Sequence, residues 1–185
     1  MLRPSGSIFI VSGQEYGASL DLLLQDTGFT IRNRITWAES FGVYCHSKFG
    51  RCSRPILYAV KDPAEAYFDG DSIRVPSARQ TKYKDKRANP LGKIPGDVWE
   101  FSRVCGTFSE RVDDVPTQLP EKLVHRMILC STALDDPILD LFSGSGTISS
   151  VAKSLSRESV AFEINPAYAE IARARLSKVA PPGAD

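Results

Sequence analysis

The sequence predicts an α/β protein with an open, doubly wound and mostly parallel sheet. Apolar runs typical of strands alternate along the chain with amphipathic stretches typical of helices. Near the C-terminus, runs at 137–142 and 159–162 enclose a glycine-containing turn and a helical stretch, which is the order of a βαβ unit. A length of 185 residues suits one domain with a sizeable core. In such sheets ligands bind at the carboxyl ends of the strands, so we expect the functional site there.

The first sixty residues predict three strands and a helix. Residues 7–11 are an apolar run of strand length, and a helix is expected over 16–27, ended by Gly28. The buried face of this helix is expected to carry Leu20, Leu23 and Leu24. Residues 30–37 alternate in polarity like a half-buried strand, and residues 55–60 form a further apolar run. We expect these last two strands to pair as a hairpin.

The rest of the chain is less regular before it becomes helical. Residues 61–115 lack sustained periodicity and are rich in Pro, Gly, Lys and Arg, which indicates an ordered insertion or a mobile loop. A helix over 120–130 is expected to bury Leu119, Leu123, Met127 and Cys130. The last helix begins at Asn165, a capping residue, with Pro166 at its first position. Its inward face is expected to carry Tyr168, Ile171, Ala172, Leu176 and Val179. Its water-facing residues are expected to be Arg173, Arg175 and Lys178.

The most informative stretch is the glycine turn, residues 140–147, with the sequence DLFSGSGT. Its glycines, Gly144 and Gly146, allow the backbone to approach a ligand without an intervening Cβ. Glu163 ends the next apolar run, 19 residues after Gly144. An acid at this spacing is where a nucleoside ribose is held. The unit therefore predicts a nucleoside-type cofactor, with a ligand-free turn as the weaker alternative.

The charge of the turn indicates which cofactor. The dinucleotide fingerprint has a third small residue, a position that Ser149 meets only loosely. Asp140 at the strand end repels a pyrophosphate but suits a ligand with an ammonium and a sulfonium, as in S-adenosylmethionine. An NAD-type Rossmann oxidoreductase remains a disfavoured alternative. Glu163 as a simple strand-end acid, and Thr147 as a simple helix cap, also remain open.

Four stretches together resemble the β-type DNA amino-methyltransferases, which make N6-methyladenine or N4-methylcytosine. They are the glycine turn, FEINPAY at 162–168, PTQLP at 116–120, and the strand at 2–11 that is similar to the one after the family's catalytic motif. The resemblance implies a Rossmann-like methyltransferase fold, S-adenosylmethionine as cofactor, double-stranded DNA as substrate and a place in restriction-modification. It implies these cofactor-binding residues: Asp140, Phe142, Gly144, Gly146, Thr147, Glu163, Ile164, Asn165, Pro116, Thr117 and Gln118.

Two departures from the family pattern matter. Leu141 stands where the family usually has proline, which gives up a fixed φ. The family's catalytic tetrapeptide, (Asp/Asn/Ser)-Pro-Pro-(Tyr/Phe), does not occur in these 185 residues. The sequence therefore resembles the C-terminal portion of such an enzyme, with a sheet incomplete at its central strand and no catalytic residue. We expect it to be inactive alone and to pair with a separate N-terminal fragment or a second copy. A non-catalytic cofactor- or DNA-binding remnant is the alternative.

The resemblance also predicts how the chain is divided. Residues 1–62 are expected to form the half of the sheet that follows the catalytic motif. Residues 63–115 are expected to be an insertion similar to a target-recognition region. Residues 116–180 are expected to form the cofactor-binding half, and 181–185 a frayed tail.

Contact with DNA must come from a local patch, because the net charge is only +1. The basic segment, residues 79–87, carries five basic side chains against one acid, with an aromatic ring among them. Basic side chains neutralise phosphates and an aromatic ring stacks on a base. The predicted DNA-binding residues are Arg79, Lys82, Tyr83, Lys84, Lys86 and Arg87. A solvated basic loop is the alternative. Trp99 is expected either to line a target-base pocket or to lie in the core.

The cysteines and the hydropathy restrict the remaining classes. The four cysteines show no metal-binding spacing, so no metal site is expected. Free thiols without a signal peptide predict a cytoplasmic protein. No apolar run reaches the length of about 18 residues that a membrane span needs, so no membrane partner is expected.

Overall fold

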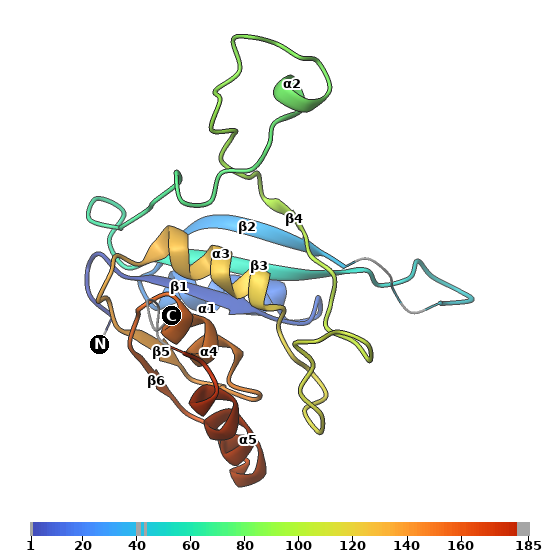
Figure 1. Cartoon of the computed structure of the whole chain (residues 1–185), viewed down its shortest axis with the longest axis vertical. Helices are drawn as coiled ribbons and strands as arrows, with labels where there is room; N and C mark the ends of the chain where they lie inside the picture. The colour runs from blue at the N-terminus through green and yellow to red at the C-terminus, as the bar shows by residue number, and fades with distance from the viewer. Residues whose placement is uncertain (1, 40–41, 43, 181–185) are drawn as a thin grey trace. The chain divides into compact units, whose positions relative to one another are not determined.

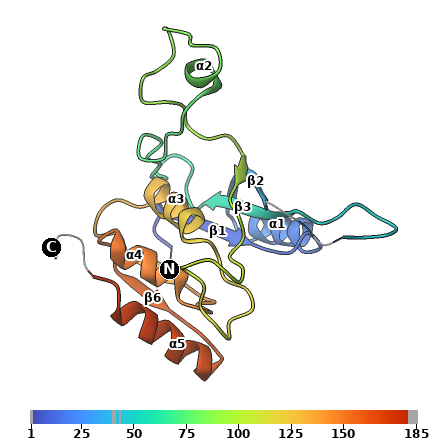
Figure 2. The ribbon, with the colours of Figure 1, turned by 45° about the vertical axis from the view of Figure 1, so that its right-hand side comes forward.

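The computed structural model describes residues 2–39, 42 and 44–180, so the expected tail at 181–185 lies outside the described residues. The chain forms two compact units. The first comprises Met1–Glu100 with Leu129–Thr132, and the second comprises Phe101–Ile128 with Ala133–Asp185. Figures 1 and 2 show the elements of each unit.

The first unit is built on a four-stranded sheet in the order β1-β3-β2-β4. The strands are β1 (Ser7–Val11), β2 (Thr30–Ala38), β3 (Ser53–Val60) and β4 (Val98–Glu100). Both β1 and β2 run antiparallel to β3, and β4 runs parallel to β2. Three of the four strands therefore share one direction, and the expected hairpin of β2 and β3 supplies the reversed one. The open α/β architecture is confirmed, and two of the three strand pairings in this sheet are antiparallel.

Helix α1 (Gly17–Asp26) covers one face of this sheet. Leu24 packs there with Leu57 and Ala59, and Leu20 joins them from one turn earlier. Leu23 was expected on the same face, but it is 55% exposed. Leu20 and Leu24, four residues apart, lie on the same face of the helix and pack in the core, whereas Leu23 lies outside that face. The chain leaves α1 through Gly28, whose φ of +83° lies in the left-handed region.

The second unit holds a two-stranded parallel sheet of β5 (Ile138–Asp140) and β6 (Ser159–Ala161). It also contains α4 (Thr147–Ser154), α5 (Pro166–Ser177) and most of α3 (Glu121–Ser131). Its core joins Val124 and Ile128 of α3 to the buried face of α4, because the apolar residues of both helices recur at helical spacing. The expected stripe of α3 is confirmed for Leu123, Met127 and Cys130, which are buried.

In the part of the chain that the structure describes, each sheet ends in strands that pair on one side only. There, β1 pairs only with β3, and β5 pairs only with β6.

Between β3 and β4 the chain leaves the first unit's sheet in an excursion that carries the short helix α2 (Ala78–Thr81), as Figure 1 shows. A capping box between Ser77 and Gln80 starts α2. A bridge between Val75 and Lys93 closes the base of the excursion. Trp99 of β4 is buried, and its indole N–H donates to the Gly96 carbonyl oxygen at 2.8 Å. Among the described residues, no helix is long and apolar enough to cross a membrane.

Candidate functional site

The two glycines of the glycine turn have different neighbours. Both have positive φ, +51° at Gly144 and +73° at Gly146, which favours glycine over any other residue. A Cβ on Gly144 would meet nothing nearer than Val115 at 4.0 Å, so this side of the turn is open. A Cβ on Gly146 would lie 2.8 Å from the Cβ of Ala172 in α5. Gly144 therefore leaves room for a ligand, whereas Gly146 allows α5 to pack against the start of α4.

Glu163 fastens the turn to the end of β6. Its Oε2 accepts a hydrogen bond from the Gly144 amide at 2.7 Å, and its Oε1 accepts one from the Asn165 amide at 2.9 Å. The Asn165 amide, followed by that of Gly144, lowers the pKa of the Glu163 carboxyl. The side chain is therefore an anion at neutral pH, held at the edge of the turn.

Asp140 ends β5 in a less satisfied environment. It is 5% exposed, and its Oδ1 accepts a hydrogen bond from the Phe142 amide at 3.1 Å. Its Oδ2 is buried without a hydrogen-bond partner among the described residues. Burial raises the pKa of the Asp140 carboxyl, and the nearby charge of Glu163 raises it further. A cation placed in this site would stabilise the ionised carboxylate.

These groups surround a cavity of about 260 Å³ within the second unit. Seven of its lining residues were predicted from the sequence: Pro116, Thr117, Asp140, Phe142, Gly144, Thr147 and Glu163. Six others were not: Val115, Leu119, Ser143, Ser145, Ile148 and Tyr168. Four of these six lie in stretches already quoted: Ser143 and Ser145 in the turn, Tyr168 in FEINPAY and Leu119 in PTQLP. The signal that could have identified these four was therefore present.

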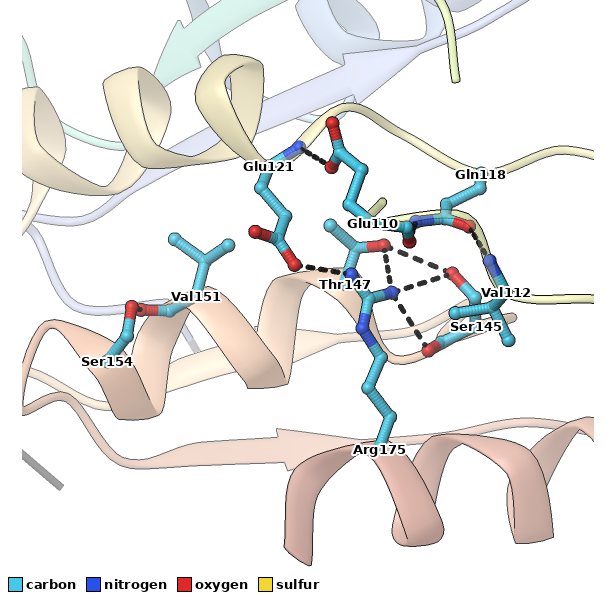
Figure 3. Close-up of polar contacts among 9 residues, drawn as sticks. All are labelled: Glu110, Val112, Gln118, Glu121, Ser145, Thr147, Val151, Ser154 and Arg175. Carbon is cyan, nitrogen blue, oxygen red and sulfur yellow. Dashed lines mark hydrogen bonds and ion pairs between the residues drawn. The ribbon is translucent and has the colours of Figure 1, made fainter. Parts of the chain in front are cut away.

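The structure places several predicted cofactor residues outside this lining, Gly146 among them. Gln118 is buried; its amide donates to the Glu110 carbonyl at 2.6 Å and accepts from the Val112 amide at 2.8 Å (Figure 3). Asn165 caps α5, as the sequence predicts. Ile164 is 99% exposed beside Glu163. Direct cofactor contacts by these residues, and by those that line the cavity, stay predictions.

Arg175 was expected to face water, and that expectation is wrong. Its side chain is only 12% exposed, and Nη1 donates to Thr147 Oγ1 at 2.9 Å (Figure 3). Nη2 donates to Glu121 Oε1 at 2.6 Å. Position 175 follows Ile171 by four residues and therefore belongs to the inward face of α5. The helical periodicity contained this signal, but the charge of the side chain obscured it.

The predicted DNA-binding residues lie together in the first unit, on α2 and the loop that follows it. All six side chains are exposed. Asp85 accepts from Arg79 at 2.7 Å and from Arg87 at 3.1 Å. Arg87 and then Arg79 hold the pKa of Asp85 well below its usual range. Lys82 lies with Nζ 5.5 Å from the ring centroid of Tyr83. The acid of the basic segment therefore engages two of its five cations.

No set of three or more His, Cys, Asp or Glu side chains in the described part of the chain is arranged to hold a metal ion. None of the four cysteines, all of which are among the described residues, forms a disulfide.

Comparison with protein families gives one match that spans almost the whole chain. Residues 1–174 match the N6/N4 methyltransferase family model, described as DNA methylase. This confirms the resemblance inferred from the four sequence stretches and argues against the alternative of an NAD-type oxidoreductase.

Two curated relatives illustrate the similarity. The type II methyltransferase M.BglII of Bacillus subtilis is 39% identical over 194 residues, which cover 96% of this chain and 53% of the relative. The DNA adenine methyltransferase YhdJ of Escherichia coli K12 is 37% identical over 184 residues, which cover 95% of this chain and 62% of the relative. The chain thus spans about half to three fifths of the length of these relatives.

A solved structure shows the same fold. The crystal structure of the M1.HpyAVI–SAM complex superimposes with a TM-score of 0.67 at 22% identity, covering 94% of this chain and 76% of that one. The chain therefore has the Rossmann-like fold of DNA methyltransferases.

Proposed function

We propose that this chain, which belongs to the N6/N4 DNA methylase family, binds S-adenosylmethionine and forms the cofactor-binding part of a DNA amino-methyltransferase. The reaction is methylation of an exocyclic amine, N6 of adenine or N4 of cytosine, in double-stranded DNA. The observation that carries the proposal is the buried, unpaired Oδ2 of Asp140 beside an open turn and an anionic Glu163.

The residues of the cavity fit this cofactor chemically. Asp140 has a free acceptor in a buried site, which suits the ammonium and sulfonium of S-adenosylmethionine. Glu163 uses one acceptor position on each oxygen for a backbone amide, so further positions are available for ribose hydroxyls. Phe142 and Ile164 are 90% and 99% exposed, and we assign them to the flanks of the adenine ring. When bound, the cofactor supplies a methyl group on a sulfonium, which is a good leaving group.

The contribution of this chain to transfer is binding and orientation. A target base must leave the duplex before its amine can be reached. The amine must then be held in line with the methyl carbon, and such positioning supplies most of the catalysis in a reaction of this kind. The family's (Asp/Asn/Ser)-Pro-Pro-(Tyr/Phe) tetrapeptide is absent from the sequence. We therefore propose that these 185 residues alone do not methylate DNA and that transfer requires a segment carrying this group, in the same polypeptide or in another.

The basic segment supplies the proposed contact with DNA. Lys82, Lys84 and Lys86 are exposed cations, and Tyr83 is 67% exposed beside them. Cations of this kind neutralise phosphates irrespective of base sequence. We propose that the segment positions the duplex without reading its sequence.

Transfer of labelled methyl groups to mixed-sequence DNA tests the proposal. The chain would be assayed alone and together with the part of the Escherichia coli relative that it does not match, fused or as a second polypeptide. We expect no transfer by the chain alone and transfer by the complemented form. Robust transfer by the chain alone would show that another side chain holds the amine. No transfer in either form, with cofactor binding intact, would favour the non-catalytic alternative.

A further inference from the structure

We propose that Arg175 is a positioning residue that makes the Ser145–Thr147 hydroxyl pair a hydrogen-bond donor for the carboxylate of the cofactor's amino-acid end. This inference rests on the proposed binding of S-adenosylmethionine. It concerns a residue that lies behind the cavity and acts through two hydroxyls that line it.

The geometry joins three helices at one guanidinium (Figure 3). Nη1 of Arg175 donates to Thr147 Oγ1 at 2.9 Å and approaches Ser145 through its carbonyl oxygen at 3.3 Å and its Oγ at 3.4 Å. The two hydroxyl oxygens lie 3.0 Å apart. Nη2 donates to Glu121 at the start of α3. Thr147 begins α4 and Arg175 belongs to α5, so the guanidinium fixes the glycine turn relative to both neighbouring helices.

Counting donors shows what this arrangement offers a ligand. A hydroxyl has one proton and two acceptor positions, whereas a guanidinium only donates. The bond between Ser145 and Thr147 uses one of the two hydroxyl protons. The second proton is therefore left over, and Arg175 fills an acceptor position on Thr147, so the pair is better placed to donate to a ligand than to accept from one. Both residues are 3% exposed and line the cavity, so the available partner for that proton is an acceptor on a bound ligand.

The charges give the cavity two unlike ends. Asp140 and Glu163 form an acidic end, which favours a cation. Arg175 stands behind the hydroxyl pair with its side chain 12% exposed, and its partner Glu121 is 44% exposed and more fully solvated. Because water screens the exposed carboxylate more than the buried guanidinium, the hydroxyl end carries a net positive potential. A zwitterion with an ammonium and a carboxylate matches this polarity.

A purely structural role for Arg175 makes a different prediction. If the guanidinium only held the helices together, its loss would loosen the turn and weaken every ligand equally. If it orients a carboxylate donor, its loss weakens only ligands that carry the carboxylate. Decarboxylated S-adenosylmethionine lacks that one group and therefore distinguishes the two roles.

The experiment is calorimetric titration of the full chain with S-adenosylmethionine and with its decarboxylated form. The variants are Arg175→Met, Arg175→Lys, Thr147→Val and the double Arg175→Met/Thr147→Val. Arg173→Met is the matched control, since Arg173 lies two residues away on α5 in an exposed pair with Glu170. We expect the unaltered chain and the control to prefer the carboxylate-bearing ligand. Arg175→Met should reduce that preference about tenfold, the loss of one charge-assisted hydrogen bond.

The remaining variants keep the test decisive. Thr147→Val should reduce the same preference for the carboxylate-bearing ligand. The double variant should lose no more of this preference than the single variant with the larger loss. Lysine cannot reproduce the several hydrogen bonds of the guanidinium, so the ligand preference of Arg175→Lys should lie between those of the wild type and Arg175→Met. If Arg175→Met does not fold, Arg175→Lys takes its place in the comparison. Equal weakening of both ligands, or an unchanged preference in folded Arg175 and Thr147 variants, would overturn the inference while leaving cofactor binding intact. Failure of the unaltered chain to bind either ligand would instead refute the proposed function, and the inference with it.

Discussion

The glycine turn and the basic segment show how differently two predicted binding regions are constrained. In the glycine turn, positive φ angles, a carboxylate bound to two backbone amides and a buried acid leave little conformational freedom. In the basic segment the cations are exposed, and two of them, Arg79 and Arg87, form ion pairs with Asp85. Backbone constraints translate directly from sequence to geometry. The availability of a charge does not, because it depends on which partner the fold brings to it.

Gly146→Ala should show the largest effect in the constrained region. The new Cβ would adopt a left-handed φ and also meet Ala172, so we expect a loss of about 2–4 kcal/mol in the free energy of unfolding. Gly28→Ala is the matched control, with positive φ and no atom within 4 Å, and should cost only about 1–2 kcal/mol. Chemical denaturation measures both. Equal losses would show that close packing against α5 is not what requires Gly146.

Asp140→Asn should separate binding from stability. Removal of the buried charge is expected to weaken S-adenosylmethionine binding by about 1–3 kcal/mol, measured by titration at pH 7. Because the folded pKa of Asp140 is raised, its favourable contribution is present below the ordinary carboxyl pKa and lost as pH rises through the folded value. The variant should therefore be the more stable protein at pH 7, with the difference vanishing in acid. Lower stability of the variant at pH 7 would contradict this account of the buried carboxyl.

Glu163→Gln should have the opposite pH dependence. The backbone amides lower the folded pKa of Glu163, so its stabilisation is present above the ordinary carboxyl pKa. It is lost as pH falls through the lowered folded value. We expect the variant to melt below the wild type at pH 7 and to approach it in acid, as thermal unfolding across pH would show. A constant difference at all pH values would mean that the ionised carboxylate does not hold the turn.

The basic segment should show the smallest effect, and one that depends on which cations are changed. Lys82→Gln with Lys86→Gln should flatten the slope of log affinity for DNA against log salt by about 1.8 units. Arg79→Gln with Arg87→Gln should flatten it less, because Asp85 already offsets these charges. Salt-dependent binding to mixed-sequence duplex DNA measures both slopes. Equal flattening by the two pairs would show that Asp85 does not compete with phosphate, and no change would mean a solvated face.

The sequence predicted the parts of the fold that local chemistry determines. The order of β5, glycine turn, α4, β6 and acid follows from apolar runs, glycines and one spacing, all within the 26 residues from Ile138 to Glu163. Strand β4 was not predicted, because Val98–Glu100 is short and becomes a strand only by pairing with β2, some sixty residues earlier in the sequence. Helix α2 was missed because four residues show no periodicity.

The sequence also identified part of the lining of the cavity, while cofactor contacts stay predictions. Residues named by motif, such as Asp140, Thr117 and Glu163, line the cavity. Arg175 was missed because a charged side chain at an inward-facing helical position usually means that the helix face has been assigned wrongly. Here the hydrogen bonds to Thr147 and Glu121 compensate for burying the charge. Gln118 shares a motif with lining residues, but its amide is occupied by the backbone at Glu110 and Val112. Such pairings depend on tertiary contacts that spacing does not reveal.

The most direct test of cofactor binding is calorimetric titration of the full chain with S-adenosylmethionine and, separately, with NAD. We expect binding of the methyl donor and no binding of NAD. Glu163→Ala should weaken binding roughly ten- to a hundredfold through loss of charge-assisted bonds, and Glu158→Ala, an exposed acid at the other end of β6, should leave it unchanged. Binding of NAD with no response to S-adenosylmethionine would contradict the account.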